Sequence, residues 1–345
     1  MTARRTTGAQ LAQLKAVLTG RRRMAIVLQD NPDPDALASA AALMYLVQHL
    51  ADLRCEIVHS GTVGRAENRA LVQYLDLALH QAEQVQWDRF DLLAMVDTQP
   101  QMGNNCLPRD LTPHIVIDHH PCKKATYKVP FRDVRNPYGA TSTMLYEYLQ
   151  KAGLPVEPTL ATALFFGIRS DTQDLGRDCI GADIEAGQAL FMLADKRALS
   201  DIQRGHVQRS YFRLLTQALV NTRVYRDAAV SNLGLLDNAD MIAEIADLLL
   251  RDDRITAVLC YGFCDNKLRL SIRTRGRGRR ADQLAKRVAS HLGTGGGHPN
   301  YAGAQIVLKG PGTLEEITLE KTVCQRFLKA LGVDQCKRES LLGYG

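Results

Sequence analysis

Short apolar runs that alternate with helical stretches constrain the fold of this chain more than any other feature. The runs are MAIVL (24–28), CEIVHS (55–60), LLAMV (92–96) and HIVI (114–117). Continuous apolar runs of this length are typical of strands buried on both faces of a parallel sheet. Helical spacing is seen at 36–50, 65–78, 140–152, 157–169 and 182–194. The pattern predicts an α/β domain with a parallel sheet and helices on both of its faces.

The pattern changes after about residue 222. A long helix is expected at 200–222, and the last third reads as a smaller α+β domain. Its expected elements are a helix at 239–251, a hairpin of strands 257–263 and 267–274 around Asp265-Asn266, a helix at 281–291, a Gly-rich turn, a strand at 304–310 and a helix at about 314–331. We therefore expect a first domain at 1–200, a helical connector at 201–224 and a second domain at 225–345. A length of 345 residues allows about two domains.

Composition indicates a globular protein that does not enter a membrane. Hydrophobic residues make up 46% and charged residues 23% of the chain, and no run of about 18 apolar residues occurs. The eight cysteines are scattered and form no CxxC pair. Scattered thiols suit a reducing compartment better than a disulfide framework, so a cytoplasmic location is expected.

Acidic residues follow the apolar runs, at the points where strands are expected to end. The residues concerned are Asp33, Asp35, Asp97, the triplet Asp118-His119-His120, and Asp171 behind the apolar stretch ATALFFGI. In an open α/β sheet, ligands bind at the carboxyl ends of the strands. Crowded carboxylates raise one another's pKa, and a divalent cation relieves that repulsion. Oxygen-rich sites with one or two imidazoles suit Mn²⁺ or Mg²⁺ better than Zn²⁺, and this many acids allow two ions about 3.5–4 Å apart.

Simpler interpretations exist for single members of this set. Asp33 stands directly before a helix and could serve only as its N-cap. Asp97 could be an ordinary loop acid. Two adjacent imidazoles would need polar partners if they were buried, so the pair His119-His120 is harder to explain as core. Together the segments predict a metal site at one rim of the sheet.

The motifs taken together resemble the DHH phosphoesterase family. The matching pieces are NPDPDALAS (31–39), VDT (96–98), IDHHP (117–121) and GIRSDT (167–172). The last third resembles the DHH-associated C-terminal domain, on SIRTRG (271–276) and GGGHPNYAGA (295–304). The resemblance follows the family's order and spacing over nearly the whole chain. It implies a catalytic domain and a substrate-binding domain, with the active site in the cleft between them.

The resemblance also implies roles for residues of the first domain. Asp33 would help to hold a first metal, and Asp97 would bridge two metals. The second metal would be held by Asp35, His119 and Asp171. His120 would contact the phosphate or assist the leaving group, and Asp118 would orient an imidazole.

One position departs from the family pattern. The first motif usually begins with a His, and Gln29 stands in its place, followed by Asp30. A neutral amide oxygen is a weaker ligand than an imidazole. Either Asp30 replaces the missing ligand, or the first metal binds loosely or only together with substrate.

In the second domain, the resemblance implies a substrate site. Its residues would be Arg273, Gly296, Gly297 and His298. An Arg offers a forked donor for a phosphate, and glycines allow close approach of a ligand to the backbone. Arg275, Arg277, Arg279 and Arg280 follow within a few positions. These arginines either extend the basic surface or form a solvated loop, and composition does not decide between the two.

The relatives with the most similar layout are short, RecJ-related proteins that degrade nano-RNA and dephosphorylate 3′,5′-bisphosphate nucleotides. Some relatives cleave linear dinucleotides. A phosphoesterase that uses two Mn²⁺ ions, or Mg²⁺, and releases nucleoside monophosphates is therefore expected. A nucleotide-binding or regulatory protein with an impaired metal site is an alternative, motivated by Gln29, and a pyrophosphatase or polyphosphatase is another. The expected partner is a short oligonucleotide or nucleotide rather than a membrane, and a homodimer is compatible with the resemblance.

Overall fold

The computed structural model describes residues 7–276, 278–308 and 313–343. The chain divides into two compact units, Met1–His206 and Val207–Gly345, and each is described by itself. The single helix expected at 200–222 is wrong, because helix α7 (Lys196–Gln203) ends before α8 (Arg209–Asn221) begins. Gly205 lies in the break, and a Cβ there would stand 2.5 Å from a backbone atom of Ala66. The helix is thus interrupted at the point where the backbone of Gly205 passes close to the backbone of Ala66.

A six-stranded sheet forms the centre of the first unit. Its strands are β1 (Arg23–Val27), β2 (Arg54–His59), β3 (Leu79–Gln81), β4 (Leu92–Val96), β5 (Ile115–Asp118) and β6 (Phe131–Val134). All neighbours pair in parallel, in the order β3-β2-β1-β4-β5-β6. The order reverses between β1 and β4. The connections from these two strands diverge there, which is where such sheets bind ligands.

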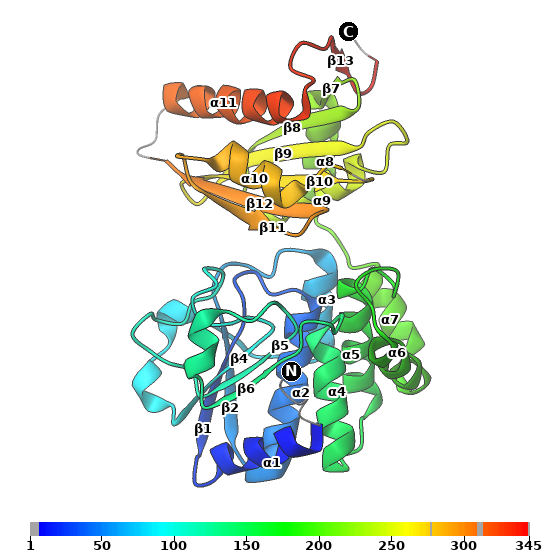
Figure 1. Cartoon of the computed structure of the whole chain (residues 1–345). Coiled ribbons are helices and arrows are strands. Elements are labelled where there is room, and N and C mark those ends of the chain that lie inside the picture. Colours follow the sequence, from blue (N-terminus) through cyan, green and yellow to red (C-terminus); the bar gives the residue numbers. More distant parts are fainter. Residues whose placement is uncertain (1–6, 277, 309–312, 344–345) are drawn as a thin grey trace. The chain divides into compact units, whose positions relative to one another are not determined.

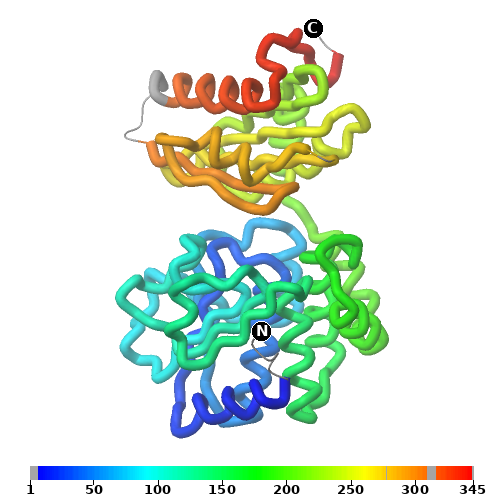
Figure 2. Tube along the Cα trace, in the orientation of Figure 1, coloured from blue at the N-terminus to red at the C-terminus, as the bar shows by residue number. Residues whose placement is uncertain are grey.

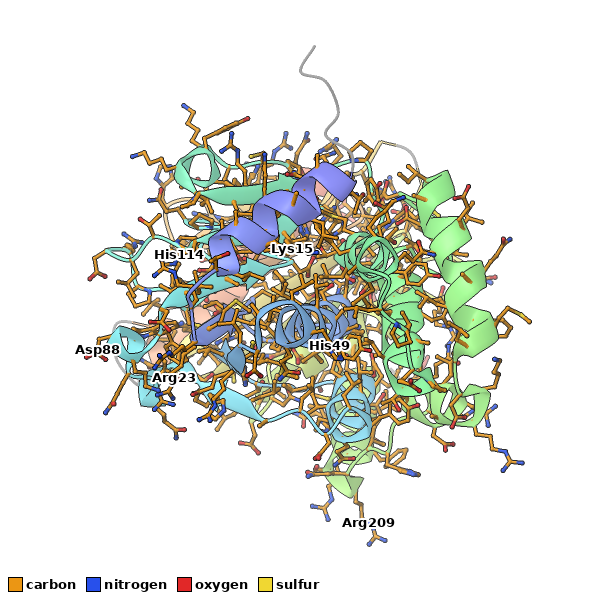
Figure 3. All side chains as sticks on the ribbon, turned by 90° about the horizontal axis from the view of Figure 1, so that it is seen from below. Lys15, Arg23, His49, Asp88, His114 and Arg209 are labelled. Carbon is orange, nitrogen blue, oxygen red and sulfur yellow. The ribbon has the colours of Figure 1, made fainter. Side chains whose placement is uncertain are left out.

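α-Helices cover one face of this sheet. They are α1 (Thr7–Leu18), α2 (Pro34–Ala51), α4 (Thr141–Ala152) and α5 (Pro158–Asp171), with α3 (Ala66–Tyr74), α6 (Gly181–Leu193) and α7 farther out. Ile26, Ala94 and Ile117, from three neighbouring strands, are buried in the core that these helices form with the sheet. Figure 1 shows α2, α4 and α5 packed side by side along the strands. Figure 3 views the first unit from the end at which its strands start, and there Arg23 and His114 mark the starts of β1 and β5.

The second face of the sheet carries short 3₁₀ helices and irregular chain, and no α-helix of the described residues covers it as one covers the first face. Val27, Met95 and Val116 point to the other face, where side chains such as Trp87 and Leu107 cover them. The covering segments are the short 3₁₀ helices η1 (Ala82–Gln84), η2 (Trp87–Arg89) and η3 (Lys124–Lys128) and the irregular connection 97–114. Right-handed crossovers place the connections after β4 and β5 on this face. The connection 97–114 contains Gly, Asn-Asn and three prolines, residues that favour turns over helix.

The second unit contains a seven-stranded sheet. Its strands are β7 (Arg223–Tyr225), β8 (Ala228–Leu235), β9 (Ala257–Cys264), β10 (Lys267–Thr274), β11 (Thr294–Gly297), β12 (Tyr301–Val307) and β13 (Arg338–Ser340), in the order β11-β12-β10-β9-β8-β7-β13. Helices α10 (Ala281–Ala289) and α11 (Thr313–Leu331) pack on one face, and α8 and α9 (Asp240–Leu249) on the other. Figure 2 traces α11 across this sheet. The predicted fold class, a parallel α/β domain followed by a smaller α+β domain, is confirmed.

The predicted hairpin is present, but the predicted Gly-rich turn is a strand. Asp265 and Asn266 connect β9 and β10 with φ of 51° and 56°, as a tight hairpin turn requires. Residues 294–297 form the edge strand β11 instead of a turn. A Cβ at Gly295 would stand 2.7 Å from the Ala285 carbonyl oxygen, so glycine lets α10 pack against this strand. None of the helices among the described residues is both long and apolar enough to cross a membrane.

Candidate metal centre

Asp35 is held at the start of two helices. It lies in the first turn of α2, is fully buried, and accepts hydrogen bonds from the backbone N–H groups of Thr141 (2.7 Å) and Ser142 (2.8 Å) at the start of α4. Gly167 of α5 passes close by, where a Cβ would stand 3.2 Å from the Asp35 Cα. Burial and then repulsion by Asp171 raise the pKa of Asp35 to about 7, despite the two N–H donors.

Asp97 follows β4 in a left-handed conformation, with φ of 57°. Its side chain is buried, and one carboxylate oxygen, Oδ1, accepts a hydrogen bond from the Thr141 hydroxyl at 3.0 Å. The other oxygen, Oδ2, is buried without a hydrogen-bond partner. Burial, and next the charge of Asp33, raise the pKa of Asp97 well above its ordinary value. The positive φ of a non-glycine residue is a strain that functional sites often carry.

The tautomer of His119 is set by the backbone. Its Nδ1 lies 3.0 Å from the carbonyl oxygen of Tyr138, which can only accept, so Nδ1 carries a proton. Its Nε2 points to Asp171 Oδ2 at 3.1 Å and Asp97 Oδ1 at 3.4 Å, yet makes no hydrogen bond. Burial lowers the pKa of this imidazole, but the contact with Asp171 outweighs it and raises the pKa to about 10. In the metal-free protein, a proton on Nε2 therefore makes the contact with the carboxylates of Asp97 and Asp171 favourable.

We call Asp35, Asp97, His119 and Asp171 the acid–imidazole cluster. One ligand atom from each of the four lies within 4.8 Å of all the others. The residues come from the starts or ends of α2, β4, β5 and α5, which the sheet order brings to one rim. Three carboxylates and one imidazole form an oxygen-rich set that suits Mn²⁺ or Mg²⁺. Two buried atoms that make no hydrogen bond, Asp97 Oδ2 and His119 Nε2, belong to this cluster, and His119 Nε2 faces two carboxylates, so the residues fit a divalent cation.

A second group overlaps with the first and consists of Asp97, Asp118, His119 and His120. One ligand atom from each of these residues again lies within 4.8 Å of all the others. Asp118 ends β5, is fully buried, and accepts from Nδ1 of His120 at 2.9 Å and from the backbone N–H of His120 at 3.1 Å. Burial would raise the pKa of Asp118, but its hydrogen bond from His120 outweighs this, and the pKa is lowered. The structure therefore places Asp118 beside His120, where it orients that ring.

Sequence reasoning missed Gln99. This amide is fully buried and donates to Asp118 Oδ2 at 2.6 Å. Its oxygen accepts from the backbone N–H of Lys123 and the hydroxyl of Thr126, both at 2.8 Å. Gln99 thus joins the loop after β4 to the loop after β5. Its position two residues behind Asp97 was the available signal, but only the three-dimensional structure gives its partners.

The residues expected for the first metal do not join the cluster. Asp33 caps α2 through the Ala36 N–H (2.9 Å) and accepts a hydrogen bond from the Gln29 amide nitrogen at 2.7 Å. Burial and then Asp171 raise the pKa of Asp33. Asp30 is in neither ligand group, and its Oδ1 accepts a hydrogen bond from the Ser60 hydroxyl. Among the described His, Cys, Asp and Glu residues, neither ligand group within 4.8 Å includes Asp33.

In the second unit, the expected substrate residues lie near one another. Arg273 is nearly buried on β10, forms a forked ion pair with Asp247, and also donates to Ser271 at 2.7 Å. Its guanidinium lies 5.9 Å from the ring of Tyr301, which stacks on His298 with centroids 4.6 Å apart. The fork that was expected to bind a phosphate thus faces an aspartate.

The two glycines of this site differ. A Cβ at Gly297, with φ of 147°, would stand 2.6 Å from the Ala302 Cα, so this glycine serves the packing of β11 on β12. Nothing lies within 4 Å of a Cβ built at Gly296. Gly296 is therefore the position where open space adjoins the strand.

The arginines that follow Arg273 are engaged within the unit. Arg279 pairs with Asp227 at 2.8 Å, and Arg280 with Asp282 at 3.0 Å. Arg275 donates to the carbonyl of Asp253. Arg277 lies outside the described residues. The described members of the run are thus satisfied locally rather than presented as a row of unpaired cations.

Two family models match the chain. The model of the DHH family, N-terminal domain, matches residues 23–168, and the model of the DHHA1 domain matches residues 227–327. The first match falls in the unit that carries the acid–imidazole cluster, and the second falls in the unit that carries Arg273 and Gly296.

Curated proteins and solved structures are similar as well. An uncharacterized protein of Methanocaldococcus jannaschii is 29% identical over 348 residues, covering 94% of this chain and 71% of that protein. A probable manganese-dependent inorganic pyrophosphatase of Streptococcus agalactiae is 27% identical over 142 residues, covering 41% of this chain and 46% of that protein. The chain therefore matches less than half the length of that pyrophosphatase.

An exopolyphosphatase-related protein from Bacteroides fragilis superposes with a TM-score of 0.69 at 16% identity, covering 94% of this chain and 98% of that one. RecJ from Thermus thermophilus in complex with Mn²⁺ superposes with a TM-score of 0.54 at 15% identity, covering 94% of this chain and 55% of that one. At 15–16% sequence identity, this structural similarity establishes the fold alone.

Proposed function

Because the chain belongs to the DHH family of metal-dependent phosphoesterases, we propose that it hydrolyses short oligonucleotides or small phosphorylated nucleotides and releases nucleoside monophosphates. Nano-RNA, linear dinucleotides and 3′,5′-bisphosphate nucleotides are the substrates within this class. The cofactor is Mn²⁺, with Mg²⁺ as the second choice, because oxygen-rich sites with few imidazoles suit these ions.

One observation carries the proposal. Asp97 Oδ2 and His119 Nε2 are buried without hydrogen-bond partners, and both belong to the acid–imidazole cluster. An unsatisfied buried polar group costs about 1–3 kcal/mol, and more when it is charged. A divalent cation held by Asp35, Asp97, His119 and Asp171 would satisfy both atoms and remove the repulsion among the carboxylates.

The chain's own residues prepare the site for the reaction. A bound divalent cation supplies neutralisation of phosphate charge and polarises a phosphoryl oxygen. The Tyr138 carbonyl holds the proton of His119 on Nδ1, which leaves Nε2 available as a ligand. Asp118 holds the ring of His120 through Nδ1, so that Nε2 of His120 is the atom that contacts the phosphate or moves a proton at the leaving oxygen.

The second unit favours a nucleotide over pyrophosphate as substrate. The similarity to pyrophosphatases covers 41–48% of this chain, whereas the DHHA1 match lies in the second unit. The open position at Gly296 and the stacked pair His298–Tyr301 suit a ligand with a sugar or a base. Pyrophosphate or polyphosphate hydrolysis is the second candidate, supported by the similarity to a probable manganese-dependent inorganic pyrophosphatase and to an exopolyphosphatase-related protein.

Gln29 motivates a third candidate, a nucleotide-binding regulator with one metal or none. The Asp33 carboxylate that would join a first metal accepts instead from the Gln29 amide. We propose that the acid–imidazole cluster binds its ion without substrate, and that an ion near Asp33 binds only when a substrate phosphate adds ligands.

The test is Mn²⁺-dependent release of nucleoside monophosphate from a 5′-phosphorylated RNA dinucleotide. A 3′,5′-bisphosphate nucleotide, pyrophosphate and a short polyphosphate are measured in parallel, with Asp171→Ala as the metal-site control. Release from a nucleotide substrate that vanishes in the variant supports the proposal. Hydrolysis of pyrophosphate or polyphosphate alone would favour the second candidate, and no hydrolysis by folded, metal-loaded protein would favour the regulator.

A further inference from the structure

One short segment, residues 138–142, contacts two members of the acid–imidazole cluster through polar groups of its own. The segment lies between β6 and the first turn of α4. The carbonyl oxygen of Tyr138 accepts a hydrogen bond from His119 Nδ1 at 3.0 Å. The hydroxyl of Thr141 donates to Asp97 at 3.0 Å. The segment therefore orients one imidazole and one carboxylate of the cluster.

The same segment also reaches the other two members of the cluster. Two of its backbone N–H groups, at the start of α4, donate to the Asp35 carboxylate at 2.7 and 2.8 Å. A Cβ at Gly139 would stand 2.5 Å from Cγ2 of Thr172, the residue directly after Asp171. A shift of the segment would therefore move the hydrogen-bond partners of three cluster residues and the packing next to the fourth.

A buried acid that belongs to neither ligand group holds this segment. Asp183 lies in the first turn of α6, which packs beside α4 and α5 (Figure 1), and its side chain is fully buried. Its Oδ2 accepts from the backbone N–H groups of Gly139 and Ile180, both at 2.9 Å. Its Oδ1 accepts from the hydroxyl of Thr143 at 2.6 Å. Asp183 thus ties the segment and the first turn of α4 to the start of α6.

Helix capping explains only part of this arrangement. An acid near a helix N-terminus is favourable because it accepts from free N–H groups and complements the helix dipole, and the contact with Ile180 serves that purpose. Burial is not needed for this role, because Asp195 caps α7 from an exposed position. A buried carboxylate costs free energy unless hydrogen bonds compensate for it. Two of the three donors to Asp183 come from the segment and the residue just behind it, so the arrangement fixes the segment.

We infer that Asp183 is a positioning residue of the metal centre, which acts through the 138–142 segment on the residues that hold the cation. The inference rests on the metal centre of the proposed function and adds a residue outside both ligand groups. Without Asp183, the N–H group of Gly139 loses its acceptor, and the neighbouring carbonyl that fixes the His119 ring is no longer held in place. Partners that orient metal ligands typically change metal affinity by about 10–100-fold.

The experiment compares Mn²⁺ binding by the wild type with binding by Asp183→Ala, Asp183→Asn and Asp195→Ala. Asp183→Ala removes all three acceptor contacts. Asp183→Asn keeps an oxygen for the Gly139 N–H, and its amide donates to the hydroxyl of Thr143. Asp195→Ala is the matched control, because it also removes an acid that caps a helix of the first unit, through contacts with Arg197 and Ala198.

Electron paramagnetic resonance provides two readouts: the free ion gives the dissociation constant, and the line shape of the bound ion reports the symmetry of its ligands. Circular dichroism and urea denaturation in EDTA show that each variant is folded and how stable it is. Affinity should fall about tenfold in Asp183→Ala, at the lower end of the range because Asp183 acts through the segment, and the line shape should change. Asp183→Asn should restore most of the affinity. Asp195→Ala should lower stability and keep both wild-type readouts.

This pattern supports the inference even if the wild type hydrolyses no nucleotide, a result that counts against the proposed function only. Wild-type affinity and line shape in folded Asp183→Ala would overturn the inference and leave the proposed function standing. An equal loss of affinity in Asp195→Ala would also overturn it, since affinity would then follow stability. The same holds for a loss that Asp183→Asn does not restore. If Asp183→Ala does not fold, Thr143→Val, which removes one donor, is measured instead, and unchanged affinity and line shape overturn the inference.

Discussion

The two units of this chain differ in how their charged residues are neutralised. In the first unit, Asp35, Asp97 and Asp171 crowd around one imidazole, with two buried atoms left unsatisfied. In the second unit, Arg273 and Arg279 each face an aspartate. In the sequence, both regions show several residues of like charge: acids behind the strands of the first unit, and arginines at 273–280 in the second. The structure separates a cluster that needs a counter-ion from a run that is already neutralised, and only the first indicates a cation site.

The largest effect should follow from removing a charge in the first unit. Asp97→Asn keeps the shape of the side chain and removes one negative charge from the cluster. We expect Mn²⁺-dependent hydrolysis to fall on the order of a thousandfold, because a metal contributes several kcal/mol to the reaction. In EDTA, the free energy of unfolding should equal or exceed that of the wild type, because a carboxyl group that is destabilised by burial, and next by the charge of Asp33, is replaced by a neutral amide. A large loss of stability in EDTA would break the comparison.

The second prediction concerns pH. The metal-free cluster holds protons, since burial and then Asp171 raise the pKa of Asp35 to about 7, and contact with Asp171 raises that of His119 to about 10. Metal ligands must be deprotonated, so Mn²⁺ competes with these protons. Affinity should rise as pH increases through about 7, with protons released on binding. Calorimetry in buffers of different ionisation enthalpy measures this release, and an affinity independent of pH between 6 and 8 would contradict it.

The third prediction tests the second unit. Asp247→Ala leaves the nearly buried Arg273 without its carboxylate partner. We expect the free energy of unfolding to fall by about 1–2 kcal/mol, at the lower end for a lost charged partner because Asp247 is half exposed. Urea denaturation with and without Mn²⁺ measures it. A stabilising effect, like that expected for Asp97→Asn, would show that the two units do not differ as described.

The smallest effect is expected at the exposed end of the arginine run. Arg280 pairs with Asp282 in solvent, and exposed ion pairs contribute little to stability. Arg280→Ala should leave the thermal midpoint unchanged within error. A clear drop would mean that the run has a structural role that its contacts do not suggest.

The sequence was sufficient to predict the parallel sheet and the gathering of Asp35, Asp97, His119 and Asp171 at one rim. Strand runs and the residues behind them are local signals, and the rule that carboxyl ends of parallel strands meet supplies the rest. The covering of the second face could not be predicted from the rule alone. The connection 97–114 follows the handedness rule but contains turn-forming residues, so it crosses the sheet without a helix.

Other features depend on contacts between distant segments. Gln99 acquires its role from Asp118 and Thr126, which lie 19 and 27 positions away. Gly297 was expected to serve a ligand, but it accommodates the neighbouring strand. Whether Arg273 binds substrate stays a prediction, since its fork is occupied by an aspartate that a sequence pattern does not reveal.

The central claim is that the acid–imidazole cluster binds a divalent cation. The most direct test is a titration of metal-free protein with Mn²⁺, followed by electron paramagnetic resonance of the free ion, for the wild type and for Asp171→Ala. Arg280→Ala serves as a matched charge control. The account predicts tight binding in the wild type and in Arg280→Ala without any substrate, and its loss in Asp171→Ala. Equal binding by the wild type and Asp171→Ala, or no binding by the wild type, would contradict it.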